Sequence, residues 1–284
     1  MSTVNSFRNM KILIIGGGNM GLTYAKSFLR AHITRKEDMM ILEKSPEKAA
    51  LLATKDIGTV CEDPGVCLAA ADLIIFAVKP QDTEALFGSI RPHVNDQQVF
   101  LTIMAGISIA AICESLGVTK VIRAMPNLPA QIGMGMTVFT SSDEVTRIEL
   151  VMVQNLINTT GKSIYVEEET RIDAATAISG SGPAYVYFFM NSMIKAAQKM
   201  GFSASESELL VAQTFKGAVD VYSKEDFSCE EWIAKVASRG GTTEAALASF
   251  TEDKVDEDIR SGTEAALNRA VELGKIAAAK SSEK

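Results

Sequence analysis

The sequence has few of the residues on which metal sites and many catalytic sites depend. It holds 2 histidines, 4 cysteines and 1 tryptophan in 284 residues, and 6% of its residues are aromatic. Two histidines argue against a histidine-rich metal site and against a histidine-based triad. The cysteines are scattered and form no Cys-x-x-Cys pair, so they indicate neither a zinc site nor a disulfide framework. We therefore expect no bound metal and a reducing, cytoplasmic setting.

The sequence also lacks an excess of positive charge and a long apolar run. Its 28 Lys and Arg against 35 Asp and Glu give a formal net charge of −7, so we expect no nucleic-acid partner. The apolar stretch over residues 68–78 is interrupted by Asp72, and no basic region followed by an apolar stretch opens the chain. We expect no export signal and no membrane span. An anionic ligand would then be held by backbone N–H groups, helix N-termini and a few cations.

Short β-rich runs that alternate with helical stretches fill the first half of the chain. The runs are residues 11–15, 39–43, 73–77, 99–103 and 120–125. This alternation predicts a doubly wound α/β fold of the Rossmann type, with a parallel sheet and helices on both faces. Residues 135–140 and 162–166 are expected to add strands, with a helix over 144–158 between them.

After Val166 the β signal stops, and the rest of the sequence is alanine-rich and helical. We therefore predict an N-terminal domain over residues 1–165 and an all-α domain over residues 166–284. The segment 183–200 is apolar almost all round over its first half, which excludes a lone surface helix. We expect it to be buried in a subunit interface, and the alternative is the centre of a monomeric helical bundle.

A glycine motif lies between the first predicted strand and the helix expected over residues 19–31. Gly16, Gly18 and Gly21 have the G-x-G-x-x-G spacing. In this context Gly16 permits the tight turn, Gly18 lets the backbone approach a pyrophosphate, and Gly21 lets helix and strand pack closely. The motif predicts an oxidoreductase that binds NADP(H) or NAD(H), and the alternative is an ordinary glycine-rich turn.

The end of the second predicted strand carries opposed signals for the ribose of that cofactor. An acid at this point favours the 2′-hydroxyl of NAD, and a cation beside a helix N-terminus favours the 2′-phosphate of NADP. Glu43 and Lys44 occupy these positions together. Ser45 and Pro46 are suited to begin the next helix whichever cofactor binds. NADPH and NADH therefore both stay open.

Three further loops follow predicted strands, at the carboxyl edge where open α/β sheets bind their ligands. Lys79 and Pro80 follow one strand, and Ala105 and Gly106 follow the next. We expect the backbone of these loops to contact the cofactor, whereas Lys79 either lies near the nicotinamide or is a solvated lysine. Asn127, in a loop fixed by prolines, either contacts the nicotinamide or only stabilises its turn.

The predicted helical domain has two glycine-containing loops of its own. Ser238 to Thr243 precede a helical run over residues 244–250. Two glycines, two hydroxyls and a helix N-terminus make a pocket suited to a carboxylate, and the alternative is a plain helix start. In the turn Ser179 to Pro183, Ser181 is either a substrate neighbour or a cap.

Taken in order, these segments resemble the pyrroline-5-carboxylate reductase family. The resemblance runs through Gly16 to Gly21, Val78-Lys79-Pro80, Ala105-Gly106, Arg123 to Asn127, Ser179 to Tyr185 and Gly240 to Thr243. Its most specific part is the Gly-Ser-Gly-Pro-Ala-Tyr turn combined with the Gly-Gly-Thr-Thr loop. It implies reduction of 1-pyrroline-5-carboxylate to L-proline by hydride transfer from NAD(P)H, the last step of proline biosynthesis. It also implies a Rossmann domain and C-terminal helices that pair into a homodimer, with a decamer in some members.

The resemblance carries roles onto particular residues. Cofactor contacts are implied at Gly18, Asn19, Met20, Ser45, Ala77, Lys79 and Pro80, and the loop arguments add Gly16, Gly21, Lys44, Val78, Ala105, Gly106 and Asn127. Substrate contacts are implied at Ser238, Gly240, Gly241, Thr242 and Thr243. Thr243 would place its hydroxyl near the imine nitrogen as the catalytic residue.

Three positions depart from the family pattern. Arg239 stands where the family usually has proline, Glu43 precedes Lys44, and Asp63-Pro64 replaces a common adenosine-contacting asparagine. Two other functions are considered as alternatives. A β-hydroxyacid dehydrogenase would need a lysine base in the helical domain, where Lys195 and Lys199 have no obvious partners. A non-catalytic dinucleotide-binding regulatory protein would leave the Gly-Gly-Thr-Thr loop without a purpose.

Overall fold

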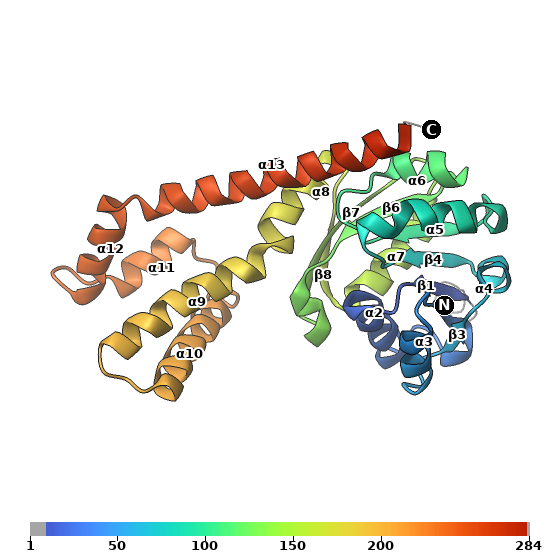
Figure 1. Ribbon diagram of the computed structural model, residues 1–284. Coiled ribbons are helices and arrows are strands. Elements are labelled where there is room, and N and C mark those ends of the chain that lie inside the picture. Colours follow the sequence, from blue (N-terminus) through green and yellow to red (C-terminus); the bar gives the residue numbers. More distant parts are fainter. Residues whose placement is uncertain (1–9, 283–284) are drawn as a thin grey trace. The chain divides into compact units, whose positions relative to one another are not determined.

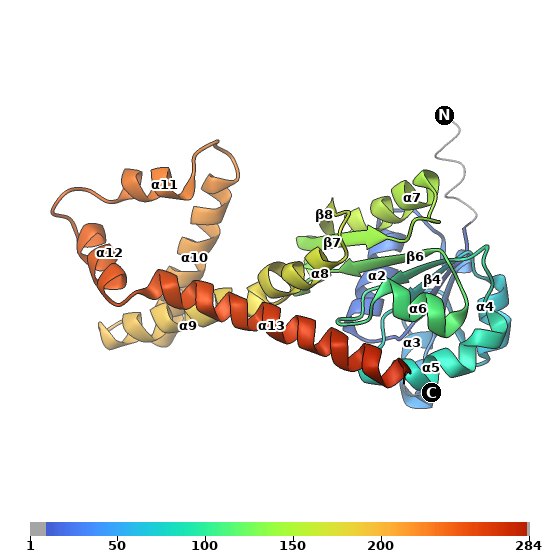
Figure 2. The same cartoon turned by 90° about the horizontal axis from the view of Figure 1, so that it is seen from above.

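The computed structural model describes residues 10–282, and in them eight strands form one sheet in the order β3-β2-β1-β4-β5-β6-β7-β8 (Figures 1 and 2). The strands are β1 (Ile12–Ile15), β2 (Met39–Leu42), β3 (Thr59–Cys61), β4 (Leu73–Phe76), β5 (Val99–Thr102), β6 (Val121–Met125), β7 (Gly135–Ser141) and β8 (Gly161–Tyr165). Neighbours are parallel except β6 and β7, which are antiparallel. The first six follow the Rossmann order, in which the chain reverses its direction of travel between β1 and β4.

Helices cover both faces of this sheet (Figures 1 and 2). They are α2 (Asn19–Arg30), α3 (Pro46–Ala53), α4 (Pro64–Ala70), α5 (Thr83–Ile90), α6 (Ile109–Leu116), α7 (Arg147–Asn158) and α8 (Thr170–Ala175). Short turns of 3-10 helix are η2 (Lys36–Asp38), η3 (Pro80–Asp82), η4 (Arg91–His93) and η5 (Leu128–Ile132), and η6 (Thr176–Gly180) is a turn of π-helix.

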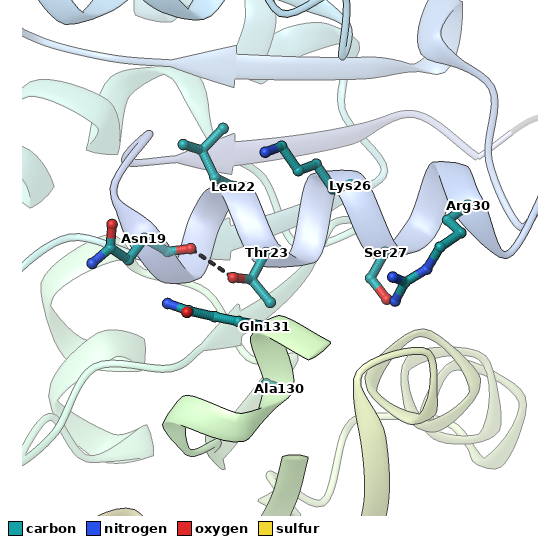
Figure 3. A pocket seen from close by; sticks show the side chains of 8 residues that line it. All are labelled: Asn19, Leu22, Thr23, Lys26, Ser27, Arg30, Ala130 and Gln131. Atoms are coloured by element: carbon teal, nitrogen blue, oxygen red, sulfur yellow. Dashed lines mark hydrogen bonds between the residues drawn. The ribbon is translucent and has the colours of Figure 1, made fainter. Parts of the chain in front are cut away.

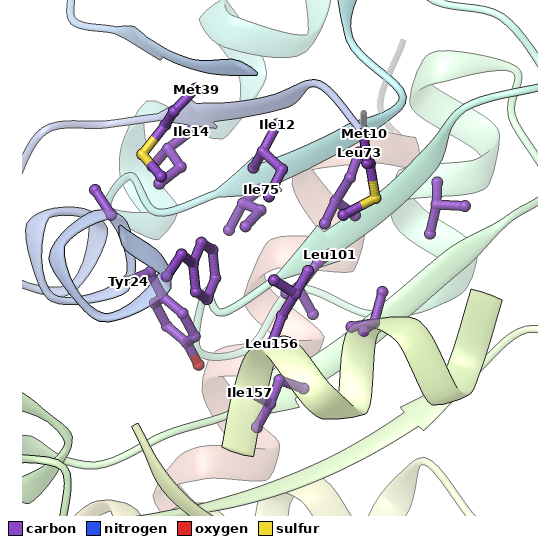
Figure 4. Packing of buried hydrophobic residues seen from close by; sticks show 14 of the residues in the cluster. Met10, Ile12, Ile14, Tyr24, Met39, Leu73, Ile75, Leu101, Leu156 and Ile157 are labelled. Carbon is purple, nitrogen blue, oxygen red and sulfur yellow. The ribbon is translucent and has the colours of Figure 1, made fainter. Parts of the chain in front are cut away.

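Alternate residues of the central strands build two apolar cores. Ile12 and Ile14 of β1 pack with Tyr24 of α2 and with side chains of α7 on one face (Figure 4). Leu13 and Ile15 pack on the other face with side chains of α4, α5 and α6. Because successive side chains of a strand point to opposite faces, a strand buried on both sides must be apolar throughout. The cores therefore fix β1 and the loop that follows it.

The predicted fold class is confirmed, and two details of the sheet were not predicted. The β3 strand is only Thr59–Cys61 and is partly exposed, so it gave no clear apolar run. The reversed direction of β7 relative to β6 was also absent from the prediction. Helix α7 begins at Arg147, later than residue 144, because Thr146 and Glu149 form a capping box there.

Two compact units make up the described chain. One unit runs through Ser181 and includes residues from Ala266 onward, and the other is Gly182–Ala265. The second unit holds α9 (Gly182–Lys199), α10 (Ala204–Tyr222), α11 (Cys229–Val236) and α12 (Thr242–Glu252). Helix α13 (Val255–Ser282) begins there, and its later turns belong to the first unit. The domain boundary at residue 165 stays a prediction.

The second unit buries very little of its apolar surface within one chain. Among its described residues only Ser207 and Val211 are buried. Helix α9 has no buried residue, and its Tyr187 and Phe188 are 57% and 69% exposed. No helix in residues 10–282 has the length and apolarity that a membrane crossing requires. Exposed apolar surface of this extent is typical of a protein interface, as the sequence predicted for this segment.

Candidate functional site

The glycine loop has the backbone that the sequence motif requires. Gly16 has φ of +105°, and a Cβ there would lie 2.8 Å from the carbonyl oxygen of Ala77. A Cβ on Gly21 would collide with the carbonyl oxygen of Gly16 and come within 3.2 Å of Ile14 Cγ2. A Cβ on Gly18 would meet nothing within 4 Å. Gly16 and Gly21 are therefore required by packing, whereas the space above Gly18 is open to a ligand.

Helix α2 starts directly at this open space. Its N-cap is Gly18, with φ of −72°, and no side chain caps the helix. The first turn carries no acidic residue. Uncapped N–H groups and the positive end of the helix dipole together suit a pyrophosphate. These residues fit a dinucleotide cofactor in the place that the motif predicted.

The end of β2 presents a fixed carboxylate. Glu43 is half-buried, and its Oε2 accepts a hydrogen bond from Gly17 N at 3.0 Å while its Oε1 accepts one from Ser45 N at 3.0 Å. The neighbouring Lys44 is 87% exposed and lies 3.5 Å from a carboxylate oxygen of Asp82. Ser45 is the N-cap of α3, which confirms its predicted capping role. Asp63 likewise caps α4.

The loops after β4 and β5 lie at the same edge of the sheet as the glycine loop, since all these strands are parallel. Lys79 is exposed and precedes η3. Gly106 has φ of +74°, and a Cβ there would lie 3.3 Å from Gly274 N of α13. Close packing of α13 therefore explains this glycine without a ligand.

Asn127 uses its side-chain amide to join three segments. Its Nδ2 donates to the carbonyl oxygen of Ser179 at 3.0 Å, and its Oδ1 accepts from Met136 N at 2.8 Å. The bonds connect the end of β6, the start of β7 and the π-helical turn η6. Of the two roles considered for this residue, the geometry favours stabilisation of the turn.

We expect Asn127→Ala to lower the free energy of unfolding by about 1–3 kcal/mol, because Met136 N–H and the Ser179 carbonyl lose their partner. Urea unfolding measures this change. Asn95→Ala is the control, because Asn95 is exposed and its Oδ1 accepts from Gln97 N within its own turn. Equal losses in the two variants would contradict the bridging role.

Two ion pairs surround the buried Arg123, which precedes Asn127 on the same strand and loop. The Arg123 side chain is 5% exposed and donates to Glu169 at 2.9 Å and to Asp173 at 2.7 Å. Glu169 also accepts from Ile109 N at 2.9 Å. These contacts tie β6 to α8 and to the start of α6. Neither acid was predicted from the sequence, although an arginine in a buried strand requires anionic partners.

The Ser238 to Thr243 loop of the second unit is a tight turn followed by a helix start. Gly241 N donates to the Ser238 carbonyl at 3.0 Å, and Gly240 has φ of +71°. Positive φ at this third position is that of a type II turn, which favours proline at its second position. Arg239 occupies that second position, so the turn forms here with an arginine in place of proline.

Helix α12 begins at Thr242 with Gly241 as N-cap and without a side-chain cap. Its first N–H groups and the hydroxyls of Thr242 and Thr243 give the hydrogen-bond donors that a carboxylate requires. Glu244 also reaches this loop, where its carboxylate accepts from Gly240 N. Glu244 was not predicted from the sequence. The available signal was an acid in the first turn of the helix, four residues after Gly240.

A pocket of about 280 Å³ lies along α2 and η5 in the first unit (Figure 3). It is lined by Asn19, Leu22, Thr23, Lys26, Ser27, Arg30, Ala130 and Gln131. Thr23 donates to the carbonyl oxygen of Asn19 at 2.8 Å. Of the predicted site residues only Asn19 reaches this pocket, so the pocket extends away from the glycine loop along the helix.

Two family models match the chain. The model described as pyrroline-5-carboxylate reductase dimerisation matches residues 169–273. The model described as NADP oxidoreductase coenzyme F420-dependent matches residues 11–106. The second match covers the glycine loop and the loops after β2, β4 and β5.

Curated relatives cover nearly the whole chain. Pyrroline-5-carboxylate reductase 2 of Bacillus subtilis is 35% identical over 93% of this chain and 95% of its own length. Pyrroline-5-carboxylate reductase of Pseudomonas aeruginosa is 31% identical over 93% of this chain and 97% of its own. Among solved structures, Plasmodium falciparum pyrroline carboxylate reductase with NADP bound has a TM-score of 0.84 and 29% identity, covering 94% of this chain and 98% of its own. The pyrroline-5-carboxylate reductase of Coxiella burnetii has a TM-score of 0.86 and 26% identity, covering 93% of this chain and 98% of its own.

Proposed function

The chain belongs to the pyrroline-5-carboxylate reductase family, and from this premise we propose that it reduces 1-pyrroline-5-carboxylate to L-proline with NADPH, the last step of proline biosynthesis. The observation that carries the proposal is the likeness to two curated reductases across almost the full length of both chains. The glycine loop and the uncapped start of α2 support NADP(H) as the cofactor.

When bound, the reduced nicotinamide supplies the hydride that C5 of the imine accepts. The residues of the chain then have three tasks, which are to hold the dinucleotide, to anchor the substrate carboxylate and to orient the imine nitrogen. Positioning accounts for most of such catalysis, because an imine that enters protonated needs little general-acid help. We assign the carboxylate to the start of α12 and the nitrogen to the Thr243 hydroxyl.

We expect Thr243→Ala to raise the KM for the imine and to lower kcat, so that kcat/KM falls by about 10- to 100-fold, the usual cost of a lost hydrogen bond to a charged group. Thr243→Ser keeps the hydroxyl and is expected to remain within about threefold of the parent. Steady-state kinetics with varied imine concentration measures both. Unchanged kinetics in Thr243→Ala would remove Thr243 from the site.

The proposed assembly is a homodimer through the helices of the second unit, with a decamer as the larger form. The exposed apolar residues of α9 support it, since none of its side chains is buried in one chain. The dimerisation model over residues 169–273 supports association of the same part. A small-molecule biosynthetic activity and cysteines that form no paired motif fit the proposed cytoplasmic location.

The direct test follows NADPH and NADH absorbance with 1-pyrroline-5-carboxylate as substrate. Oxidation of either cofactor that depends on the imine is the expected result, and no oxidation of either would overturn the proposal. A hydroxyisobutyrate-like acid with the oxidised cofactors tests the β-hydroxyacid dehydrogenase alternative. Tight dinucleotide binding without turnover of any imine would instead favour a non-catalytic role.

A further inference from the structure

We propose that Glu43 lowers the affinity of the glycine-loop site for NADP(H) relative to NAD(H), and so sets the cofactor preference of this chain. The inference rests on the dinucleotide site of the proposed function. NADP(H) still binds through the start of α2 in this view, and the ratio of the two affinities is what Glu43 controls.

The Glu43 carboxylate is held in a fixed position. Glu43 directly follows β2, and its two oxygens accept from Gly17 N and Ser45 N, both at 3.0 Å. One bond reaches the glycine loop, and the other reaches the N-cap of α3. A carboxylate held from both sides stays at the end of β2, where the adenosine ribose of a Rossmann dinucleotide lies. It also occupies the Ser45 N–H, so this donor is not open to a 2′-phosphate.

The charges around Glu43 are not balanced by its neighbouring cation. Lys44 is the cation expected to attract a 2′-phosphate, but it is 87% exposed and its ammonium lies 3.5 Å from Asp82. The Asp82 side chain is 44% exposed, so water screens this pair and the lysine is only partly neutralised. The half-buried Glu43 is less screened than either of them. The local balance at the ribose is therefore negative.

A carboxylate treats the two cofactors in opposite ways. The 2′-hydroxyl of NAD can donate to a free lone pair of Glu43 in a charge-assisted hydrogen bond. The 2′-phosphate of NADP has no hydroxyl to donate at this place and carries about two negative charges near neutral pH. Hydrogen bonding and repulsion thus act in the same direction, so removal of the charge is expected to change the affinity ratio by about tenfold or more.

The test is titration calorimetry of NADP⁺ and NAD⁺ with the full chain. Glu43→Gln is expected to raise the NADP⁺ affinity relative to that of NAD⁺ by about tenfold or more. Glu47→Gln is the matched control, because Glu47 is exposed in the first turn of α3 and its loss should leave the ratio within about twofold. A parallel loss of both affinities in Glu43→Gln would mean that Glu43 only supports the loop, and it would overturn the proposal, as would an unchanged ratio.

A second measurement needs no variant. The pyrophosphate contributes equally to both cofactors, so the effect of salt on the affinity ratio isolates the 2′-phosphate. Net repulsion at the ribose predicts that higher ionic strength raises the NADP⁺ affinity relative to NAD⁺, and the opposite trend would show net attraction and overturn the proposal. Because binding requires no imine, a failure of the proposed reaction leaves these results intact and distinguishable.

Discussion

Gly18→Ala is expected to keep the melting temperature of the parent chain and to weaken NADP⁺ binding by at least about tenfold, whereas Gly21→Ala is expected to lose stability as well. A Cβ on Gly18 meets no protein atom within 4 Å, and φ of −72° suits alanine. The new methyl would occupy the space that the approaching pyrophosphate requires. The cost therefore falls on the ligand and not on the fold.

The Gly21 variant differs because the obstacle is backbone. Its Cβ would collide with the carbonyl oxygen of Gly16. That carbonyl cannot shift without a change in the backbone of Gly16, whose φ is +105°. Helix α2 would have to shift from β1, at a cost of about 1–3 kcal/mol or more from overpacking. Thermal unfolding and calorimetric titration separate the two effects.

Gly88→Ala in α5 is the control for these variants. Its Cβ also meets nothing within 4 Å, and its site in a helix favours alanine by about 0.5–1 kcal/mol. We expect a small gain in stability and no change in binding. A Gly18→Ala chain that binds NADP⁺ as the parent does would show that the pyrophosphate does not lie against residue 18.

Features of the site that depend on local backbone were predictable from sequence. Gly16 needs a positive φ directly after β1, and Ser45 caps the helix that starts at the next residue. Each of these requirements involves only a few neighbouring residues, so it can be recognised from the order of residue types in the sequence. The apolar strands are recognisable for the same reason, and β3 was missed because Thr59–Cys61 is short and partly exposed.

Partners distant in the chain were not predictable from spacing. The bond of Glu43 to Gly17 joins residues 26 positions apart, and that of Asn127 to Ser179 joins residues 52 apart. The buried Arg123 required a carboxylate, but its position alone could not select Glu169 among the acids of the chain. In each case the sequence indicates which kind of group the side chain needs as a partner, and only the fold identifies the residue that provides it.

Phe188→Glu is expected to convert the proposed homodimer to monomers and to lower imine reduction, because the unit that carries the Ser238 to Thr243 loop has little core of its own. Phe188 is 69% exposed in one chain, within a helix that buries none of its side chains there. Burial of a phenylalanine side chain stabilises an interface by about 1.5–3 kcal/mol. A two-fold interface contains the same residue from both chains, so each substitution acts twice. The loss of about 3–6 kcal/mol, before any cost of the new charges, weakens a dimer by about 10²- to 10⁴-fold.

Sedimentation analysis across a range of concentrations measures this effect, and imine-dependent NADPH oxidation is followed on the same samples. Gln198→Glu introduces the same charge near the end of α9 at a polar, exposed position, so it is expected to leave the dimer intact. A Phe188→Glu protein that stays dimeric would exclude this part of α9 from the interface.

The dependence of stability on concentration follows from the same surface. The only buried described residues of the second unit are Ser207 and Val211, which is too small a core to hold the unit folded by itself, so we expect its stability to depend on the partner chain of the proposed homodimer. When folding and association are coupled, dilution favours the unfolded state, and the melting temperature of the parent protein should rise with protein concentration. In Phe188→Glu the melting of this unit should be lower and should lose that dependence, because no partner remains to bury α9. The first unit has its own two apolar cores, so it is expected to melt separately at a temperature that the substitution does not change.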